Sequence, residues 1–202
     1  MDFLGRGGGA AYPETVSLYA PVSSPAEVRL RPATPDDAAI LAAWDLEPHV
    51  IACSTDDPEA DVAFGGIPWR EELEDQSDIS FYRIAEVAGR PIGVIQVCDP
   101  HREPTRYWGE IEPNLRAIDI WIGPKDALDR GYGTQMMTLA LDDCFAAPEV
   151  TAILIDPLNT NIEAHRFYQR LGFEVVGQRM FDADDCLVHR LSRDMWEGRR
   201  RS

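Results

Sequence analysis

The chain has 202 residues, of which 45 % are hydrophobic, and its formal net charge is −16 at pH 7. This length suits one globular domain with its own core, and the acidic balance argues against binding to nucleic acid or to an anionic membrane surface. No apolar run approaches the ~20 residues that a membrane-spanning helix needs.

The first 27 residues are rich in Gly, Pro and Ser, and no basic segment is followed there by an apolar one. We therefore expect a flexible N-terminal extension over 1–27, no signal peptide, and one domain over 28–202 in a cytoplasmic protein. The cysteines are widely spaced without a C-x-x-C motif, which favours reduced thiols and predicts no metal site. They are Cys53, Cys98, Cys144 and Cys186.

A short strand is predicted over 28–31, and a helix directly after it. Thr34 suits the N-cap, Pro35 the first helical position and Asp37 the acid of a capping box. The helix is expected to end before Pro48. The domain therefore begins with a strand and a helix.

The stretch over 49–75 mixes turn signals with aromatic residues, which predicts a long loop ending in a short helix over 69–75. Loops of this length are often lids or binding loops. Two apolar runs joined at Gly89-Arg90 predict an antiparallel hairpin over 79–99.

LRAIDIWIG, residues 115–123, predicts a further strand. Alternation puts Leu115, Ala117, Asp119 and Trp121 on one face, and Arg116, Ile118, Ile120 and Ile122 on the other. A helix over 129–144 and a buried strand over 150–156 follow.

NTNIEAHRFYQRLGF predicts another helix, which Gly172 ends as a C′ glycine. The last two strands are predicted over 173–180 and 186–192. This order of elements predicts a single α+β domain on a central mixed sheet.

Two glycines, Gly131 and Gly133, stand where the helix over 129–144 begins, although glycine costs about 1 kcal/mol relative to alanine inside a helix. A helix N-terminus has free N–H groups and about half a positive charge, and glycine removes the Cβ atoms that would keep a phosphate away. The alternative is a loop that needs a positive φ angle or a close approach of helix and sheet. The spacing fits neither a Walker loop nor a dinucleotide fingerprint.

The order strand, G-x-G turn and helix, followed by a strand, D-P-x-N-x-N, a helix and Y-x-x-x-G-F, resembles the GNAT superfamily of acetyl-CoA-dependent N-acetyltransferases. In that family the turn, commonly [Q/R]-x-x-G-x-[G/A], holds the coenzyme pyrophosphate. Leu128 occupies its first position here, which removes a helpful side chain but leaves the backbone amides. The resemblance implies a GNAT fold, with a mixed, mostly antiparallel sheet flanked by helices.

The resemblance also implies acetyl-CoA as the cofactor. A backbone N–H near Trp121 or Ile122 is expected to hold the thioester oxygen. The residues implied as cofactor contacts are Ile120, Trp121, Ile122, Arg130, Gly131, Tyr132, Gly133, Thr134, Asn159 and Asn161.

In the family segment similar to residues 156–174, an asparagine near the helix start contacts the pantetheine arm, so Asn159 and Asn161 are the candidates. A tyrosine on that helix, here Tyr168, stands near the thioester sulfur. Tyrosine, with an unperturbed pKa of about 10, is protonated at neutral pH and suits a general acid toward the thiolate. The alternative is a core aromatic residue, because apolar residues share the helix.

Residues 108–174 are similar to aminoglycoside 6′-N-acetyltransferases that carry E-x-D-P-x-x-R-x-I-D on the strand before the turn, with Glu112-Pro113 here in place of Asp-Pro. This likeness implies that Asp119 orients or deprotonates the acceptor amine. An aspartate within AIDIWI is costly to bury without a partner. A salt bridge to Arg116 is the alternative, although alternation puts Arg116 on the opposite face.

We expect a cationic small-molecule acceptor, most simply the 6′-amine of an aminoglycoside, and direct attack, because the scattered histidines offer no nucleophile–base pair. The acids near 182–185 could help to bind a cationic acceptor, and a solvated hairpin turn explains them equally well. The candidate substrate contacts are Trp69, Tyr107, Trp108, Asp119, Asp156, Asp182 and Asp184.

Three alternatives remain: a siderophore lysine-type N-acyltransferase, a polyamine N-acyltransferase, and a non-catalytic coenzyme-binding sensor. Asp119 and Tyr168 favour an enzyme. We expect a monomer or homodimer without nucleic-acid or membrane partners.

Overall fold

The computed structural model describes residues 26–201, and the predicted extension over 1–27 lies almost wholly outside them. Within that range seven strands form one sheet in the order β1-β2-β3-β4-β5-β7-β6. Among these described strands β4 and β5 are the one parallel pair, so the sheet is mixed but mostly antiparallel, which confirms the predicted class. The strands are β1 (Val28–Pro32), β2 (Ser80–Val87), β3 (Arg90–Cys98), β4 (Leu115–Ile122), β5 (Ala152–Ile155), β6 (Glu174–Phe181) and β7 (Asp184–Ser192).

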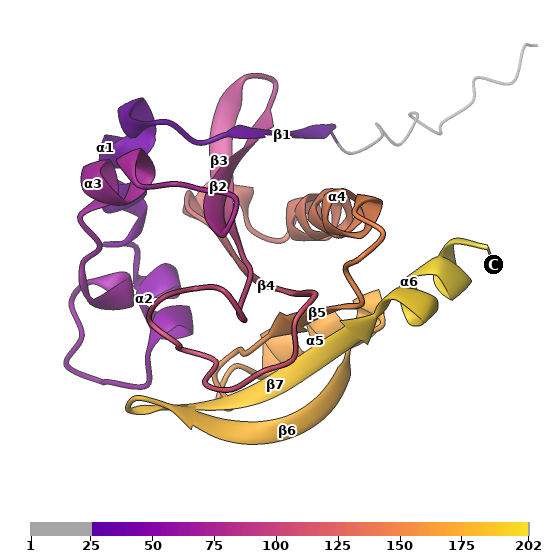
Figure 1. Ribbon diagram of the computed structural model, residues 1–202. Helices are drawn as coiled ribbons and strands as arrows, with labels where there is room; N and C mark the ends of the chain where they lie inside the picture. Colours follow the sequence, from indigo (N-terminus) through magenta and orange to yellow (C-terminus); the bar gives the residue numbers. More distant parts are fainter. Residues whose placement is uncertain (1–25, 202) are drawn as a thin grey trace, which may run out of the picture.

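Helices cover both faces of this sheet (Figure 1). Residues of α4, α5 and α6 join one core cluster with the sheet, and residues of α1 to α3 join a second. The helices are α1 (Ala38–Trp44), α2 (Pro48–Ser54), α3 (Trp69–Glu74), α4 (Tyr132–Ala146), α5 (Ile162–Leu171) and α6 (Arg193–Arg200), with 3-10 turns η1 (Pro35–Asp37), η2 (Ala63–Gly65) and η3 (Lys125–Ala127).

The two halves of the sheet diverge at β4 and β5. Their pairing begins at Leu115 with Ala152 and ends at Ala117 with Leu154, whereas β4 continues to Ile122. The remaining part of β4 therefore has a free edge on the β5 side. Such an edge leaves N–H and C=O groups available to a ligand.

Capping signals placed several elements correctly. Thr34 N–H donates to Asp37 Oδ2 at 2.8 Å, as a capping box requires, and Gly172 ends α5 with φ at 99°. The expected loop after Pro48 is wrong in part, because Pro48 is the first residue of α2. Helix α6, begun by Ser192 accepting from the Met195 N–H, was not predicted at all.

The predicted strand boundaries are close to those observed, but β7 begins at Asp184, two residues earlier than expected. Within residues 26–201, no helix combines the length and apolar character needed to cross a membrane.

Candidate active site

Asp119 lies on the face of β4 that the sequence indicated. Its neighbours on that face, Ala117 and Trp121, are buried in two different core clusters, the first beneath the β3–β4 loop and the second beneath α1 to α3. Ile118 belongs to the third cluster, on the opposite face. Asp119 itself is exposed. It is therefore a solvent-accessible residue between two buried neighbours on the same face of β4.

The Asp119 carboxylate makes no hydrogen bond or ion pair with any side chain in residues 26–201. Although solvent reaches it, the surrounding protein desolvates it and, with the nearby negative charge of Asp156, raises its pKa to about 7. A carboxylate with such a pKa changes its protonation near neutral pH, as a general base should.

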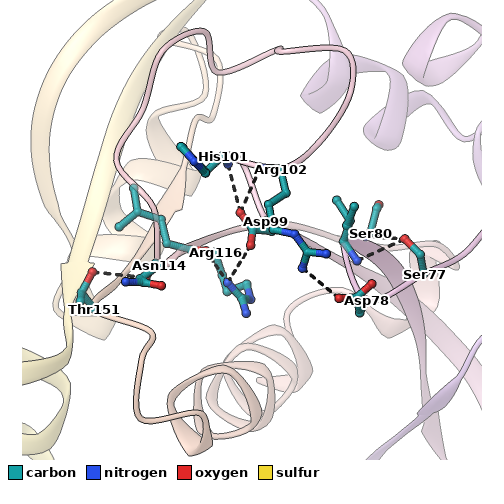
Figure 2. Close-up of polar contacts among 11 residues, drawn as sticks. Ser77, Asp78, Ser80, Asp99, His101, Arg102, Asn114, Arg116 and Thr151 are labelled. Carbon is teal, nitrogen blue, oxygen red and sulfur yellow. Dashed lines mark hydrogen bonds and ion pairs between the residues drawn. The ribbon is translucent and has the colours of Figure 1, made fainter.

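Arg116, the alternative partner of Asp119, makes its side-chain contacts with other residues. Arg116 Nη1 lies 3.5 Å from Asp99 Oδ2, and it donates to the Leu115 carbonyl at 2.7 Å. Figure 2 shows Asp99 accepting from Arg116 and from the backbone N–H groups of His101 and Arg102. The pair joins the first residue after β3 to the second residue of β4. It thereby ties together the two ends of the β3–β4 loop.

Asp156, directly after β5, is the second acid of the site. It accepts a hydrogen bond from the Tyr107 hydroxyl at 2.7 Å. Desolvation raises the pKa of Asp156, while the Tyr107 hydrogen bond and the charge of Arg179 oppose that rise. Asp119 and Asp156 thus form an acid pair in which each carboxylate is near the other's charge; Asp156 has a side-chain partner and Asp119 has none in the described chain.

Three tyrosines lie near enough to Asp119 to be affected by its charge. Burial and the charge of Asp119 both raise the pKa values of Tyr82, Tyr107 and Tyr168, so all three are protonated at neutral pH. Tyr168 on α5 is 7 % exposed, and its hydroxyl has no hydrogen-bond partner in the described chain. A protonated hydroxyl at such a position can donate to a leaving group.

The backbone favours glycine at one of the two turn positions, Gly131 and Gly133, but not at the other. Gly131 is the N-cap of α4 with φ at 76°, a conformation that favours glycine. Gly133 lies inside the helix without a positive φ, and a Cβ atom there would meet nothing closer than Phe167 at 3.7 Å. Neither backbone conformation nor close packing requires glycine at 133. The space beside its Cα is therefore available to a ligand.

The amides of the first turn of α4 are free as well. No side chain caps this helix, so the N–H groups of Tyr132, Gly133 and Thr134 have no protein acceptor in the described chain. Arg130 is exposed beside them, and its Nε donates to the Asp126 carbonyl at 2.7 Å. This combination of amides and a cation suits a diphosphate.

The free edge of β4 leads from this turn toward Asp119. Gly123 N–H donates to the Ile92 carbonyl of β3. Alternation therefore directs the amides of Ile120 and Ile122 to the opposite edge, while that of Trp121 faces β3. The Ile122 carbonyl already lies 2.9 Å from His49 Nε2.

The two asparagines of the β5–α5 connection differ in what they bind. Asn161 caps α5, since its Oδ1 accepts from the Ala164 N–H at 3.1 Å. Asn159 Nδ2 donates to Asp185 at 3.0 Å, and its carbonyl lies 3.2 Å from His165 Nε2. Both side chains thus already have protein partners, and their role toward the cofactor stays a prediction.

The end of α2 is tied to the other half of the sheet. Thr55 Oγ1 and the Asp56 N–H both donate to Asp184 Oδ1 at 2.8 Å, and Thr160 Oγ1 donates to Asp56 Oδ1 at 2.8 Å. We call these three hydrogen bonds the α2 tie. Asp184 therefore serves a structural contact, whatever it contributes to an acceptor.

The remaining residues predicted to contact the acceptor differ in solvent exposure. Trp69 and Trp108 are 3 % and 4 % exposed, and Trp69 Nε1 donates to Asp45 at 2.6 Å. Tyr107 is 45 % exposed, and Asp182 lies in the turn after β6. The contribution of the two tryptophans to acceptor binding stays a prediction.

Sequence reasoning missed Tyr82 and Arg179, which lie near the acid pair. Neither has a local motif, because Tyr82 comes from β2 and Arg179 from β6. Only the strand order, which brings these segments together, reveals them.

The model of the acetyltransferase (GNAT) domain family matches residues 33–181. The chain belongs to this family and is an acetyl-CoA-dependent N-acetyltransferase. The turn glycines, the free amides of α4 and the free edge of β4 fit that cofactor.

Among its relatives, aminoglycoside N(6′)-acetyltransferase type 1 of Klebsiella pneumoniae is 30 % identical over 162 residues, which cover 74 % of this chain and 75 % of that protein. A kanamycin resistance protein of Rhizobium radiobacter is 37 % identical over 76 residues, 37 % of this chain and 70 % of that protein. The crystal structure of aminoglycoside acetyltransferase AAC(6′)-Ib with coenzyme A and kanamycin matches with a TM-score of 0.71 and 29 % identity, over 87 % of this chain and 100 % of that one.

Proposed function

We propose that the protein acetylates the 6′-amine of an aminoglycoside by direct attack of the amine on the thioester. One observation carries this proposal: the Asp119 carboxylate is exposed and has no side-chain partner, the nearby charge of Asp156 helps to raise its pKa, and it lies on the part of β4 whose edge is free. Named relatives that act on aminoglycosides support the choice of acceptor.

The coenzyme supplies the acetyl thioester. The first-turn amides of α4, with Arg130, would hold the diphosphate, and the edge amides of Ile120 or Ile122 would hold the thioester oxygen. Asn159 and Asn161 lie at the start of α5, where the pantetheine arm would pass if it follows the edge of β4.

Asp119 prepares the amine. An ammonium group is drawn to the acid pair, and Asp119, which has a pKa of about 7, accepts a proton from it directly or through water. The neutral amine then attacks the thioester carbonyl. The protonated hydroxyl of Tyr168 donates a proton to the departing thiolate, and the proton that the acylated nitrogen loses, directly or through water, restores that hydroxyl. No acyl-enzyme is needed, because the amine is itself the nucleophile.

The acceptor must be cationic and broad enough to contact several acids. Asp119 and Asp156 attract ammonium groups, and the exposed ring of Tyr107 beside them can face a sugar. An aminoglycoside has both properties, with several ammonium groups on sugar rings.

A turnover screen tests the proposal. Wild type and Asp119→Asn are assayed for thiol release from acetyl-CoA with aminoglycosides, polyamines and N6-hydroxylysine, and mass spectrometry locates the acetyl group. We expect acetylation at the 6′-amine of aminoglycosides, and its loss in the variant. Turnover restricted to polyamines or hydroxylysine would refute the acceptor, and coenzyme binding without turnover of any amine would refute the activity.

A further inference from the structure

A hollow lies between the β3–β4 loop and the hairpin of β6 and β7. Its volume is about 330 Å³, and its exposed lining is mainly polar. Arg106 and Tyr107 line it from the loop, Arg179 from β6, and Asp182 from the turn after β6. Two guanidinium groups and one carboxylate make it net positive, in a chain with a net charge of −16.

Tyr107 joins this hollow to the acid pair. Its ring stacks on Phe181, with centroids 4.5 Å apart, while its hydroxyl donates to Asp156 at 2.7 Å. The charge of Arg179 also reaches Asp156, where it opposes the rise in the pKa of that acid. A negative region at Asp119 and Asp156 and a positive region at the hollow therefore meet at one tyrosine side chain.

The two arginines are held differently. Arg179 Nη1 donates to the Trp108 carbonyl at 2.7 Å, and its guanidinium carbon lies 4.7 Å from the centre of the Phe181 ring. Arg106 makes no side-chain hydrogen bond or ion pair within residues 26–201, and neither does Asp182. Arg179 is thus fixed in place, while all five N–H donors of Arg106 remain available to a ligand.

We propose that this hollow is a second acceptor subsite, in which Arg106 and Arg179 bind a hydroxyl or carboxylate group of the acceptor and disfavour an ammonium group. The proposal rests on the proposed function, because the reacting amine must lie at Asp119 for the rest of the acceptor to reach the hollow. Guanidinium groups only donate hydrogen bonds, so they match oxygen lone pairs and repel a second cation. The acceptor that suits both regions carries its amine at one end and oxygen groups at the other.

Three matched acceptors test this subsite. They are 6-amino-6-deoxyglucosides whose aglycone is 2-hydroxyethyl, carboxymethyl or 2-aminoethyl. Their kcat/KM values are measured for wild type, for Arg106→Gln, and for Arg70→Gln as a control, which removes an exposed guanidinium from α3. In Arg106→Gln we expect kcat/KM for the two oxygen-bearing compounds to fall about three- to ten-fold relative to the ammonium compound, the effect of one exposed charge-assisted hydrogen bond. In Arg70→Gln these ratios should stay at the wild-type value.

The outcomes separate the subsite from the proposed function. An equal change for all three compounds in Arg106→Gln would reveal only a general field effect and would overturn the subsite. A larger loss for the carboxymethyl compound identifies an anionic group as the preferred ligand, and equal losses for the two oxygen-bearing compounds identify a hydroxyl.

If wild type acetylates none of these compounds, the proposed function fails for this acceptor class. Calorimetric titration of the same compounds into wild type and Arg106→Gln, both saturated with coenzyme A, then decides the subsite alone. A selective loss of affinity for the oxygen-bearing compounds supports it. Affinities that do not depend on the variant, or an absence of binding, overturn it.

Discussion

Asp119→Asn should remove activity and at the same time stabilise the folded protein above neutral pH. In the folded state the pKa of Asp119 is raised from 3.8 to about 7, so between these values the folded state binds more protons than the unfolded chain. Folding stability is therefore lost through this residue as pH rises from about 4 to 7. Asparagine has no proton to lose and escapes that penalty.

The size of the effect follows from the same shift. A rise of about three pKa units corresponds to about 4 kcal/mol without screening, but Asp119 is exposed, and solvent screening leaves about 1 kcal/mol. For a domain of this length, that is a change in Tm of about 2–4 °C. Differential scanning calorimetry of wild type and variant at pH 5 and pH 8 measures it.

We expect the Tm difference between variant and wild type to grow by that amount from pH 5 to pH 8. Asp194→Asn, which replaces an exposed carboxylate on α6, a helix of the opposite face of the sheet, is the control and should show no such growth. A Tm difference for Asp119→Asn that is the same at both pH values, or that falls as pH rises, would refute the reasoning.

Three further predictions concern the reaction. Asp156→Asn removes a negative charge near Asp119 and should therefore lower the pKa of Asp119. The acidic limb of the pH profile of kcat/KM, near pH 7 in wild type, should then move to lower pH. A midpoint that does not move would contradict the influence of Asp156 on Asp119. Gly133→Val should cover the first-turn amides of α4 and raise the Kd of coenzyme A, measured by calorimetry, about ten-fold or more. Gly133→Ala is the control and should fold normally, because a Cβ atom has room there. An equal Kd for Gly133→Val and wild type would count against the diphosphate site. Tyr168→Phe should lower kcat about 100-fold with little change in KM, and a kcat near the wild-type value would end its role as the acid.

The parts of the fold that sequence reasoning placed correctly have local causes. Alternation along LRAIDIWIG separated the two faces of β4, and Gly172 marked the end of α5. The errors also have local causes. Proline breaks a helix interior, so the sequence predicts a boundary at Pro48, but at the first position of a helix proline costs no hydrogen bond. Ser192 begins α6 as an N-cap, a signal that lies within the last predicted strand.

The site was only partly predictable. The strand and helix order brings Asp119, Asp156, Tyr107 and Tyr168 near one another, while their roles stay predictions. The sequence could not show which of the two acids has a hydrogen-bond partner, because the Tyr107–Asp156 hydrogen bond joins residues 49 positions apart. The same holds for Arg179, whose position depends on the pairing of β6 with β7. Such long-range contacts have no local signal.

The α2 tie bears on how firmly α2 is held beside the acid pair. Beyond Ala117 no backbone ladder joins β4 to β5, and Thr55, Asp56 and Thr160 link the end of α2 to Asp184 and to the start of α5 on the far side of that gap. Three solvent-accessible hydrogen bonds are a modest restraint, each contributing about 1 kcal/mol. The end of α2 can consequently adjust to acceptors of different breadth, and the loop between α2 and α3 becomes a place where acceptor range can be altered while the reacting groups stay fixed.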